Sequence, residues 1–387
     1  MEIIYSAAAR LGGVGIANVV NHAVNAIYRA GYLKKVIVYG NSQGAVPTSL
    51  IKNVWFQPTK VFSSLSSRYY YSMKRMWLDY NASRYIKGHG CHIFHGWTHE
   101  CLRSAREAKK QGAITIVERG YCHPLYSKRV LDEEYERWGL KRHPEGRIIL
   151  KKYDHWHREE TAALEEFEEA DYVFVPAQFA KDTFLEYGFP EQKIVIIPRA
   201  ADMDYYRPSE KKKDIFRAVF VGMLNIRKGI PYLLEAWRQL NLMDAELMLV
   251  GSVHDEIKSF LQRYKGVKNI RITGFVKNPV ELYNSASVFV FPTLDEGSAK
   301  VTYEAMACGL PVITTPNAGS LVTDGIDGYL VNIRDVEAMK EKILFLYNNP
   351  DAGKEMGRQA RLNIEPYTWQ RYEQNLIAKY EEIWERQ

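Results

Sequence analysis

The sequence predicts an α/β protein with two doubly wound units, each a parallel sheet covered by helices. Three observations lead to this prediction. The chain has 387 residues, more than one hydrophobic core usually supports. Short β-branched and aromatic runs alternate with helical patterns along most of the chain, which is typical of parallel strands joined by crossover helices. A polar stretch at 199–214, which contains Pro208, interrupts this alternation, and we expect the linker between the units there.

The first unit is expected to contain six strands. Each is a short run rich in β-branched or aromatic residues, and the spacing between them leaves room for helices. The predicted strands cover residues 2–7, 35–40, 91–97, 113–118, 172–177 and 193–198.

The second unit repeats this scheme more regularly and ends in helices. The last segment of the chain places large apolar side chains at helical intervals, so one face of a terminal helix must dock on another element. That face consists of Trp369, Tyr372, Leu376, Tyr380 and Ile383. The predicted strands cover 217–222, 245–251, 269–274, 288–293 and 311–315, and further helices cover 335–348 and 351–363.

Composition places the chain among globular proteins, with 46% hydrophobic and 25% charged residues. No segment approaches the roughly 18 uninterrupted apolar residues that a membrane-spanning helix needs, and the first residues lack the pattern of a secretory signal. We therefore expect a soluble, cytoplasmic protein. Its four cysteines are far apart in the sequence, which indicates reduced thiols and no disulfide framework.

Charge is unevenly distributed along the chain. Residues 1–131 contain 18 Lys and Arg against 5 Asp and Glu, a net charge of +13, so the rest carries −7 of the total of +6. A basic unit attracts an anionic acceptor, an acidic membrane surface or nucleic acid. The stretch 60–88 mixes aromatic residues with Lys74, Arg75 and Arg84. It is compatible with membrane contact, an acceptor groove, or an ordinary helix with one packed and one basic face.

The segment 295–331 carries the strongest chemical signal. Glu296 and Glu304 flank seven residues directly after a predicted buried strand. The chain turns through small residues at 297–299 and enters a helix, whose free backbone N–H groups attract an anion such as a diphosphate. Glu304 lies about two turns along the same helix face, so the two carboxylates can bind different hydroxyls of one extended ligand.

This segment resembles the donor-binding motif of family 4 glycosyltransferases, in which two Glu residues separated by seven others precede Ala-Met-Ala-x-Gly-x-Pro-Val. The resemblance implies that Glu296 contacts the donor sugar, that Glu304 holds the ribose hydroxyls, and that the loop and helix start between them meet the phosphates. Residues 324–329 look like the turn after the last main strand. The motif matches at Glu296, Glu304, Ala305, Met306, Ala307, Gly309, Pro311 and Val312. The expected donor-binding stretch between the two Glu residues is Gly297, Ser298, Ala299, Lys300 and Val301.

A second block, 221–237, resembles the strand, loop and helix that carry a diphosphate-binding Lys six residues after a Gly. Gly222 and Lys228 have this spacing. A fixed cation there stabilises the negative charge on a departing nucleoside diphosphate. Most relatives have Arg directly after the Gly, whereas this chain has Met223. Arg227 is the candidate that supplies the missing positive charge. The alternative is that this protein binds the donor phosphates more weakly than its relatives do.

Two weaker signals accompany these blocks. Phe275 and Val276 resemble the loop whose backbone reads the nucleobase, although packing at a strand end explains them equally well. Gly12, Gly13 and Gly15 follow the first strand. The corresponding loop of the family lies at the cleft, but any doubly wound unit needs a tight turn there.

The sequence does not decide which residue takes the place of one histidine that is common in the active sites of this family. Many family members have a His, close to the reacting sugar, at the end of the strand that corresponds to 113–118. Here Arg119 takes roughly that place, and His123 lies four residues later. Arg119 could bind an anionic acceptor or a donor phosphate, His123 could reach the cleft, or both could be structural. The catalytic candidates are therefore Glu296, Lys228, Arg119 and His123.

Histidines gather in the first unit, but we expect no metal site. His92 and His95 are three residues apart in a predicted strand, so they should point to opposite faces of the sheet. By resemblance, enzymes of this family require neither a metal nor another cofactor.

The chain as a whole resembles the GT-B architecture, two Rossmann-like domains that face each other across a cleft. We expect an acceptor-side domain at 1–200 plus 366–387 and a donor-side domain at 201–365. The resemblance implies a retaining hexosyltransferase that uses a uridine, guanosine or adenosine diphosphate sugar. The leaving phosphate would take the acceptor's proton. The basic first unit favours an anionic acceptor: a sugar phosphate, as in sucrose-phosphate synthases, a phospholipid or a polysaccharide.

Two other functions are compatible with the same fold. An enzyme that hydrolyses or epimerises the nucleotide sugar has little use for a basic face. A catalytically silent nucleotide-sugar-binding protein, or a nucleic-acid binder, is the second alternative. The presence of Glu296, Lys228 and Glu304 argues against a catalytically silent protein. The chain has no recognisable nucleic-acid-binding module, which argues against a nucleic-acid binder. We therefore expect a nucleotide-sugar donor, an anionic acceptor, at most peripheral membrane contact, and no nucleic-acid partner.

Overall fold

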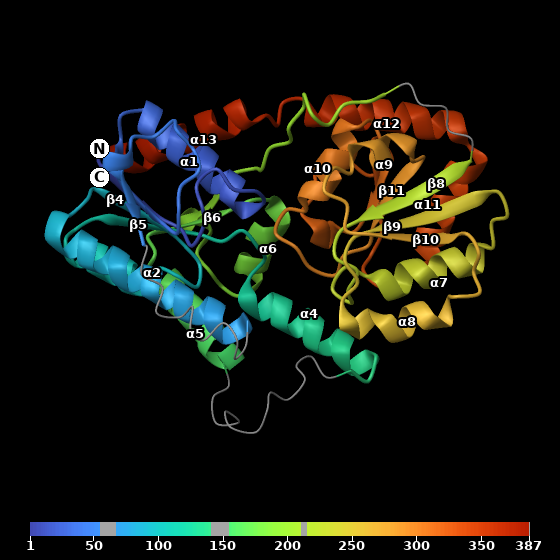
Figure 1. Cartoon of the computed structure of the whole chain (residues 1–387), viewed down its shortest axis with the longest axis horizontal. Coiled ribbons are helices and arrows are strands. Elements are labelled where there is room, and N and C mark those ends of the chain that lie inside the picture. Colours follow the sequence, from blue (N-terminus) through green and yellow to red (C-terminus); the bar gives the residue numbers. More distant parts are fainter. Residues whose placement is uncertain (55–66, 141–154, 210–214, 387) are drawn as a thin grey trace.

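The computed structural model describes residues 1–54, 67–140, 155–209 and 215–386. They form two parallel sheets covered by helices, and the two units lie next to each other (Figure 1). Both termini lie in the unit that contains the first sheet. The predicted fold class, α/β with two doubly wound units, is confirmed.

The first sheet has seven parallel strands in the order β3-β2-β1-β4-β5-β6-β7. The order changes direction between β1 and β4, and ligands bind at such a switch point in doubly wound sheets, next to the carboxyl ends of the strands. The strands are β1 Ile3–Ser6, β2 Leu33–Val38, β3 Ile51–Asn53, β4 Ile93–Trp97, β5 Ile114–Glu118, β6 Tyr172–Val175 and β7 Ile194–Ile196.

The second sheet has six parallel strands in the order β10-β9-β8-β11-β12-β13, with its switch point between β8 and β11. The strands are β8 Phe216–Val221, β9 Ala245–Val250, β10 Ile270–Gly274, β11 Val288–Phe291, β12 Val312–Thr314 and β13 Gly328–Leu330.

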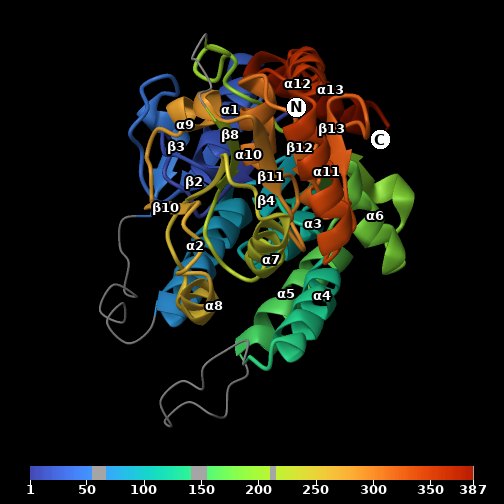
Figure 2. The ribbon, with the colours of Figure 1, turned by 90° about the vertical axis from the view of Figure 1, so that its right-hand side faces the viewer.

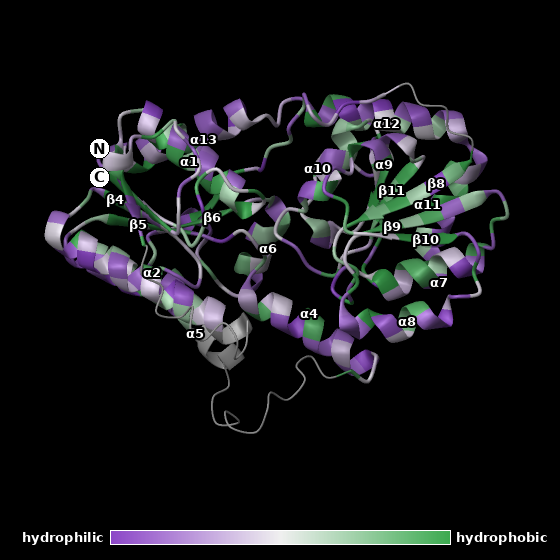
Figure 3. Cartoon of the chain, in the orientation of Figure 1, coloured by the Kyte–Doolittle hydropathy of each residue, from purple (hydrophilic) through white to green (hydrophobic). Residues whose placement is uncertain are grey.

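Helices surround both sheets. The strands are mainly apolar, whereas polar and apolar residues alternate along the helices (Figure 3). This is the pattern of parallel sheets that are buried on both faces. None of the helices within the described ranges combines the length and the apolar character needed to cross a membrane. The helices are α1 Ile16–Arg29, α2 Ser67–His89, α3 Leu102–Lys110, α4 Pro124–Arg137, α5 His155–Glu169, α6 Gln178–Glu186, α7 Ile230–Leu240, α8 Lys258–Arg263, α9 Val280–Ser285, α10 Lys300–Ala307, α11 Val336–Asn348, α12 Pro350–Ile364 and α13 Trp369–Glu385.

The terminal helix α13 packs on the first unit, although the chain reaches it from the second. It contacts α1, and His22 of α1 stacks on Trp369 with ring centres 4.1 Å apart. The expected docking of the apolar face is confirmed. The residues of that face in the core of the first unit are Tyr372, Leu376, Tyr380 and Ile383.

Two short strands differ from the prediction. β3 and β13 have three residues each, and unlike the equally short β7 and β12 neither contains two adjacent β-branched residues that would mark a strand in the sequence. β13 lies where a turn was expected at 324–329, and it pairs with β12. A Cβ at Gly328 would lie 2.2 Å from the Val312 carbonyl oxygen, so the pairing requires glycine. The turn prediction is therefore wrong for the second half of that segment.

Helix α4 does not follow the division into two units. It comes after β5 of the first sheet, yet Val130 belongs to the hydrophobic core of the second unit, and Tyr126, Trp138 and Leu140 pack against that core. Figure 1 shows α4 running below the second unit towards α8, and Figure 2 shows it beside α5. The helix therefore bridges the two units.

Candidate active site

Two loops of the second unit meet at the carboxyl end of its sheet. One leads from β8 to α7 and the other from β11 to α10. The Leu294 amide donates to the Arg227 carbonyl at 2.8 Å and joins them. Gly229 has a φ of 71°, and a Cβ on it would lie 1.9 Å from the Pro292 carbonyl oxygen. Glycine is therefore required for this close approach.

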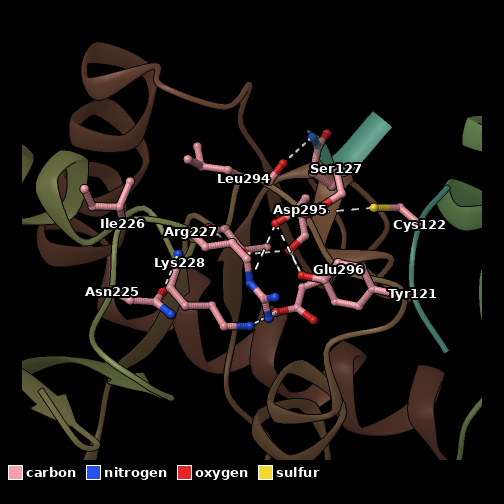
Figure 4. Close-up of polar contacts among 12 residues, drawn as sticks. Tyr121, Cys122, Ser127, Asn225, Ile226, Arg227, Lys228, Leu294, Asp295 and Glu296 are labelled. Atoms are coloured by element: carbon pink, nitrogen blue, oxygen red, sulfur yellow. Dashed lines mark hydrogen bonds and ion pairs between the residues drawn. The ribbon is translucent and has the colours of Figure 1, made fainter. Parts of the chain in front are cut away.

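Lys228 and Glu296 form an ion pair where these loops meet (Figure 4). Their side chains are only 13% and 11% exposed. Arg227 adds a second cation, with Nη2 3.7 Å from Glu296 Oε1. Burial, and after it the charge of Arg227, holds the pKa of Lys228 well below its usual range. The structure thus brings together three residues that the sequence placed around the donor.

The N-terminus of α10 begins in the same loop. Its N-cap residue, Ala299, makes no side-chain cap hydrogen bond. The unpaired N–H groups and the helix dipole at such an end attract an anion. A Cβ on Gly319 would lie 2.2 Å from the Gly297 carbonyl oxygen, so only glycine at 319 allows the backbone to pass this close to the loop before α10. Together the cations and the helix start can attract an anion such as a diphosphate.

Glu304 lies further along α10 with its carboxylate held in place. The Tyr283 hydroxyl donates to Oε2 at 3.0 Å, and Tyr206 forms a further hydrogen bond with Glu304. Burial raises the pKa of Glu304, while the charge of Lys300 lowers it. A carboxylate fixed in this way can accept hydrogen bonds from ligand hydroxyls.

A pocket of about 570 Å³ opens in the first unit, and its lining includes residues that follow β1, β4 and β5. This is the switch point of the first sheet. Its wall includes the basic side chains of Arg10, Lys74 and Arg75. Glu100 also lines it, and burial raises the pKa of this carboxyl to about 8, so that it is mainly protonated at neutral pH. Arg119 and Glu118 also line it, so the cations outnumber the carboxylates and the pocket is positive on balance.

Asp295 connects the wall of this pocket to the donor-side loop. Its side chain is 0% exposed. The Tyr121 hydroxyl donates to its backbone oxygen at 2.8 Å, and Ser127 Oγ donates to Oδ2 at 2.5 Å (Figure 4). A Cβ on Gly297 would lie 2.3 Å from the Gly120 carbonyl oxygen. The pocket wall and the donor-side loop are thus in direct contact.

Arg119 lies at this junction, as expected for a cleft residue. It lines the pocket, and its Nε donates to the Cys122 carbonyl at 3.0 Å. Its Nη1 lies 2.9 Å from Nε2 of His99. His99 also lines the pocket and has a φ of 75°, which is uncommon for a residue other than glycine. His99 was not among the predicted site residues.

His123 has a structural position instead. Its Nδ1 accepts the Leu125 N–H at 3.3 Å, so it is the N-cap of α4. Its ring stacks on Tyr187 at 4.7 Å and packs edge-on against Phe184. Burial lowers its pKa to about 4. His123 is not among the residues that line this pocket, and its contacts favour the structural alternative, while a catalytic role stays a prediction.

The glycine loop after β1 lies beside the pocket. Gly12 and Gly15 have φ angles of 78° and 67°, and Gly15 is the N-cap residue of α1. A Cβ at Gly13 would lie 2.9 Å from the Arg10 carbonyl oxygen. Val14 and Ile16 of the same segment line the pocket. The loop thus borders the pocket of the first unit.

The remaining predicted donor residues lie at the edge of the second unit. Phe275 is 76% exposed, whereas Val276 packs partly against the core. Met223 is half exposed, whereas the Lys228 side chain pairs with Glu296 and lies over the ring of Phe291. A nucleobase role for Phe275 and Val276 stays a prediction.

The histidines near β4 do not lie as expected. His92 accepts the Glu2 N–H, and its ring lies 4.9 Å from that of Trp384. His95 lies 2.7 Å from the Tyr380 hydroxyl through Nδ1. Both contact α13, so the expectation of opposite sheet faces is wrong, because β4 begins only after His92. Across the described ranges, no three His, Cys, Asp or Glu side chains are grouped to hold a metal ion.

Two Rossmann-like units whose switch points meet at a shared junction define the class: this is a GT-B fold. Residues 14–205 match the family model Glycosyltransferase Family 4, and residues 216–349 match the model Glycosyl transferases group 1. The chain belongs to the family 4 type of glycosyltransferases.

Curated relatives agree with this assignment. The chain is 31% identical over 159 residues to the capsular polysaccharide biosynthesis glycosyltransferase CapM of Staphylococcus aureus. The aligned stretch covers 39% of this chain and 42% of that protein. It is 28% identical over 229 residues to a D-inositol 3-phosphate glycosyltransferase of Paenarthrobacter aurescens, 54% of this chain and 56% of that one. The chain spans about half the length of the curated relatives it matches.

Solved structures with the same fold cover the whole chain. A sucrose-phosphate synthase from Thermosynechococcus elongatus superimposes with a TM-score of 0.70 at 17% identity, over 100% of both chains. Anabaena Alr3699/HepE, solved in complex with UDP and glucose, gives a TM-score of 0.68 at 15% identity, over 99% of this chain and 100% of that one. At these identities the likeness establishes the fold.

Proposed function

We propose that this protein transfers a sugar, with retention of anomeric configuration, from a nucleoside-diphosphate sugar to an acceptor bound in the pocket of the first unit. The contact between the two halves of the site carries this proposal. The Lys228–Glu296 pair belongs to the donor-side loops, and Gly297 of the same loop lies directly against Gly120 of the pocket wall. A donor bound at the loops therefore has its sugar next to the pocket.

The donor side is suited to a nucleoside diphosphate. Lys228, Arg227 and the start of α10 attract the phosphates. A bound diphosphate would compete with Glu296 for Lys228, which frees the carboxylate to accept hydrogen bonds from the sugar. Glu304 would hold the ribose hydroxyls. The neighbour solved with UDP and glucose supports a uridine diphosphate sugar as the donor.

In the proposed reaction, the bond between the anomeric carbon and the diphosphate oxygen breaks. The acceptor oxygen forms its bond to the anomeric carbon on the same face. The acceptor proton passes to the departing phosphate oxygen, which acts as the base. Lys228 stabilises the negative charge that grows on the leaving group. Because Glu296 is assigned to the sugar hydroxyls, the proposed mechanism uses no covalent nucleophile, and we propose that it also needs no metal.

We propose that the acceptor is anionic. Arg10, Lys74 and Arg75 supply positive charge at the pocket, and Arg119 lies where the pocket meets the donor side. Two relatives, the D-inositol 3-phosphate glycosyltransferase and the sucrose-phosphate synthase, have a phosphate compound in their names. The same positive charge suits an acceptor presented at an acidic membrane surface as well as a free sugar phosphate.

A thermal-shift screen tests the proposal. A ligand that binds only the folded protein raises its Tm, by the equivalent of about 2.7 kcal/mol at a hundred times its Kd. We expect nucleoside diphosphates and their sugars to raise the Tm, with uridine compounds giving the largest shift. Nucleoside monophosphates, which lack the second phosphate, are the control and should give a smaller shift. No shift with any nucleoside diphosphate or its sugar contradicts the proposal.

A further inference from the structure

Helix α4 is attached to the second unit at both of its ends. At its start, Ser127 donates to Asp295 in the donor-side loop. Near its end, Glu134 and Tyr135 contact side chains of the second unit. Residues 119–123 connect β5 to α4, so the position of the helix determines where Arg119 and its neighbours lie.

Glu134 is a fully buried carboxylate with partners on both oxygens. Its Oε1 accepts from the Tyr232 hydroxyl and from the Trp138 indole N–H, both at 2.6 Å. Its Oε2 accepts from Arg334 Nε at 2.8 Å, and the side chain is 0% exposed. Tyr232 and Arg334 belong to the second unit. A buried charge whose partner is removed is strongly unfavourable, so these bonds define one position of α4 on that unit.

Arg334 directs all three guanidinium nitrogens at α4. Besides Nε, its Nη1 lies 3.1 Å from Glu133 Oε2, and its Nη2 donates to the Val130 carbonyl at 3.2 Å. Its φ of 69° lies in the left-handed region, which few residues other than glycine adopt. Such backbone strain persists only where the surroundings enforce it, and it concentrates at functional positions.

We propose that Glu134 and Arg334 are positioning residues: they fix α4 to the second unit and thereby align the segment Arg119–Tyr121 with the donor-side loop. The inference rests on the proposed function, since it concerns the alignment of acceptor and donor sides. Neither residue is among those that line the pocket or pair with Lys228. A buried ion pair contributes little net stability compared with apolar packing, whereas it can specify one geometry.

The same helix offers a matched control. Arg129 Nη1 lies 2.5 Å from Glu186 Oε1, so this pair joins α4 to α6 within the first unit. Its side chains are 46% and 42% exposed, and exposed pairs of this kind contribute little. Arg129→Asn therefore removes an α4 ion pair, and with it the contact of the guanidinium with the Tyr126 ring, but leaves the bonds between Glu134 and Arg334 intact.

The experiment compares Arg334→Asn, Glu134→Gln and the double variant with Arg129→Asn. Asn tolerates a positive φ, so Arg334→Asn removes the guanidinium without adding backbone strain. Small-angle scattering measures the separation of the units, and steady-state kinetics with a uridine diphosphate sugar measures kcat and KM for the donor. Tyr232→Phe, which removes only a hydroxyl group, replaces any variant that does not fold.

We expect Arg334→Asn to lower kcat about tenfold with donor KM nearly unchanged, because a misaligned site loses rate and not donor contacts. The radius of gyration should increase, the double variant should be no worse than the more impaired single variant, and Arg129→Asn should behave as wild type. An unchanged kcat and scattering curve in folded Arg334→Asn, or an equal loss in Arg129→Asn, would overturn the inference. If the wild type releases no nucleoside diphosphate from the sugar in the absence of an acceptor, scattering alone decides the role of α4, and the thermal-shift screen separately decides the proposed function.

Discussion

Lys228→Ala and Glu296→Ala are each expected to lower donor turnover at least about a hundredfold. Lys228 offsets charge that appears on the leaving diphosphate only as the bond breaks, and Glu296 orients the sugar that carries the reacting carbon. Because each is the main partner of the other in a nearly buried pair, the two losses should not add. The measurement is release of the nucleoside diphosphate from its sugar, followed at saturating donor.

Loss of a buried ion-pair partner can also destabilise the fold, so the same variants need a stability control. Lys228→Met combined with Glu296→Gln removes both charges and keeps the side-chain volume. We expect this double variant to unfold near the wild-type denaturant midpoint and to remain inactive. The exposed Lys265, replaced by alanine, is the matched surface control in the same unit. Near-normal turnover in both Lys228→Ala and Glu296→Ala would remove these residues from the mechanism.

Gly297→Ala is expected to have the second large effect. Its Cβ would lie 2.3 Å from the Gly120 carbonyl oxygen and 2.6 Å from the Tyr121 Cα, so backbone must move on one side of the junction. A shift of about 1 Å between donor and acceptor sides is expected to cost about a hundredfold in turnover. Overpacking should also lower the free energy of unfolding by about 1–3 kcal/mol. Donor turnover and urea unfolding measure the two effects.

Gly266→Ala is the control for this substitution, because no atom lies within 4 Å of a Cβ built there. It should keep both turnover and stability. Affinity of Gly297→Ala for the nucleoside diphosphate should fall much less than its turnover, since Lys228 lies on the other loop. Wild-type turnover in Gly297→Ala would show that the two sides need not be in contact.

Most of the fold could be predicted from the sequence, because short apolar strands that alternate with amphipathic helices leave a recognisable pattern. Every predicted strand overlaps a strand of the structure, although β2 and β8 begin two residues and one residue before the predicted ranges. β3 and β13 could not be found in this way, because neither contains two adjacent β-branched residues, unlike the equally short β7 and β12. The bridging position of α4 also had no local signal. It depends on Val130 and Glu134 meeting residues that lie far away in the sequence.

The site could be predicted in part. Glu296 and Lys228 were recognisable because their spacing to neighbouring glycines and alanines follows a motif, and the structure pairs them. Asp295 and His99 were missed, because their contacts with Ser127 and Arg119 exist only in the folded chain. For His123 a signal was available: Pro124 follows it, and proline favours the first position of a helix, which makes the residue before it an N-cap.

The central claim is that Lys228 and the start of α10 hold the diphosphate of the donor. Calorimetric titration of uridine diphosphate into the wild type, Lys228→Ala and Lys265→Ala tests it most directly. We expect saturable one-to-one binding by the wild type and Lys265→Ala. Lys228→Ala should bind at least about tenfold more weakly, because a hydrogen bond to a charged group contributes about 1.5–3 kcal/mol. Equal affinities of the wild type and Lys228→Ala, or no binding by either, would contradict the account.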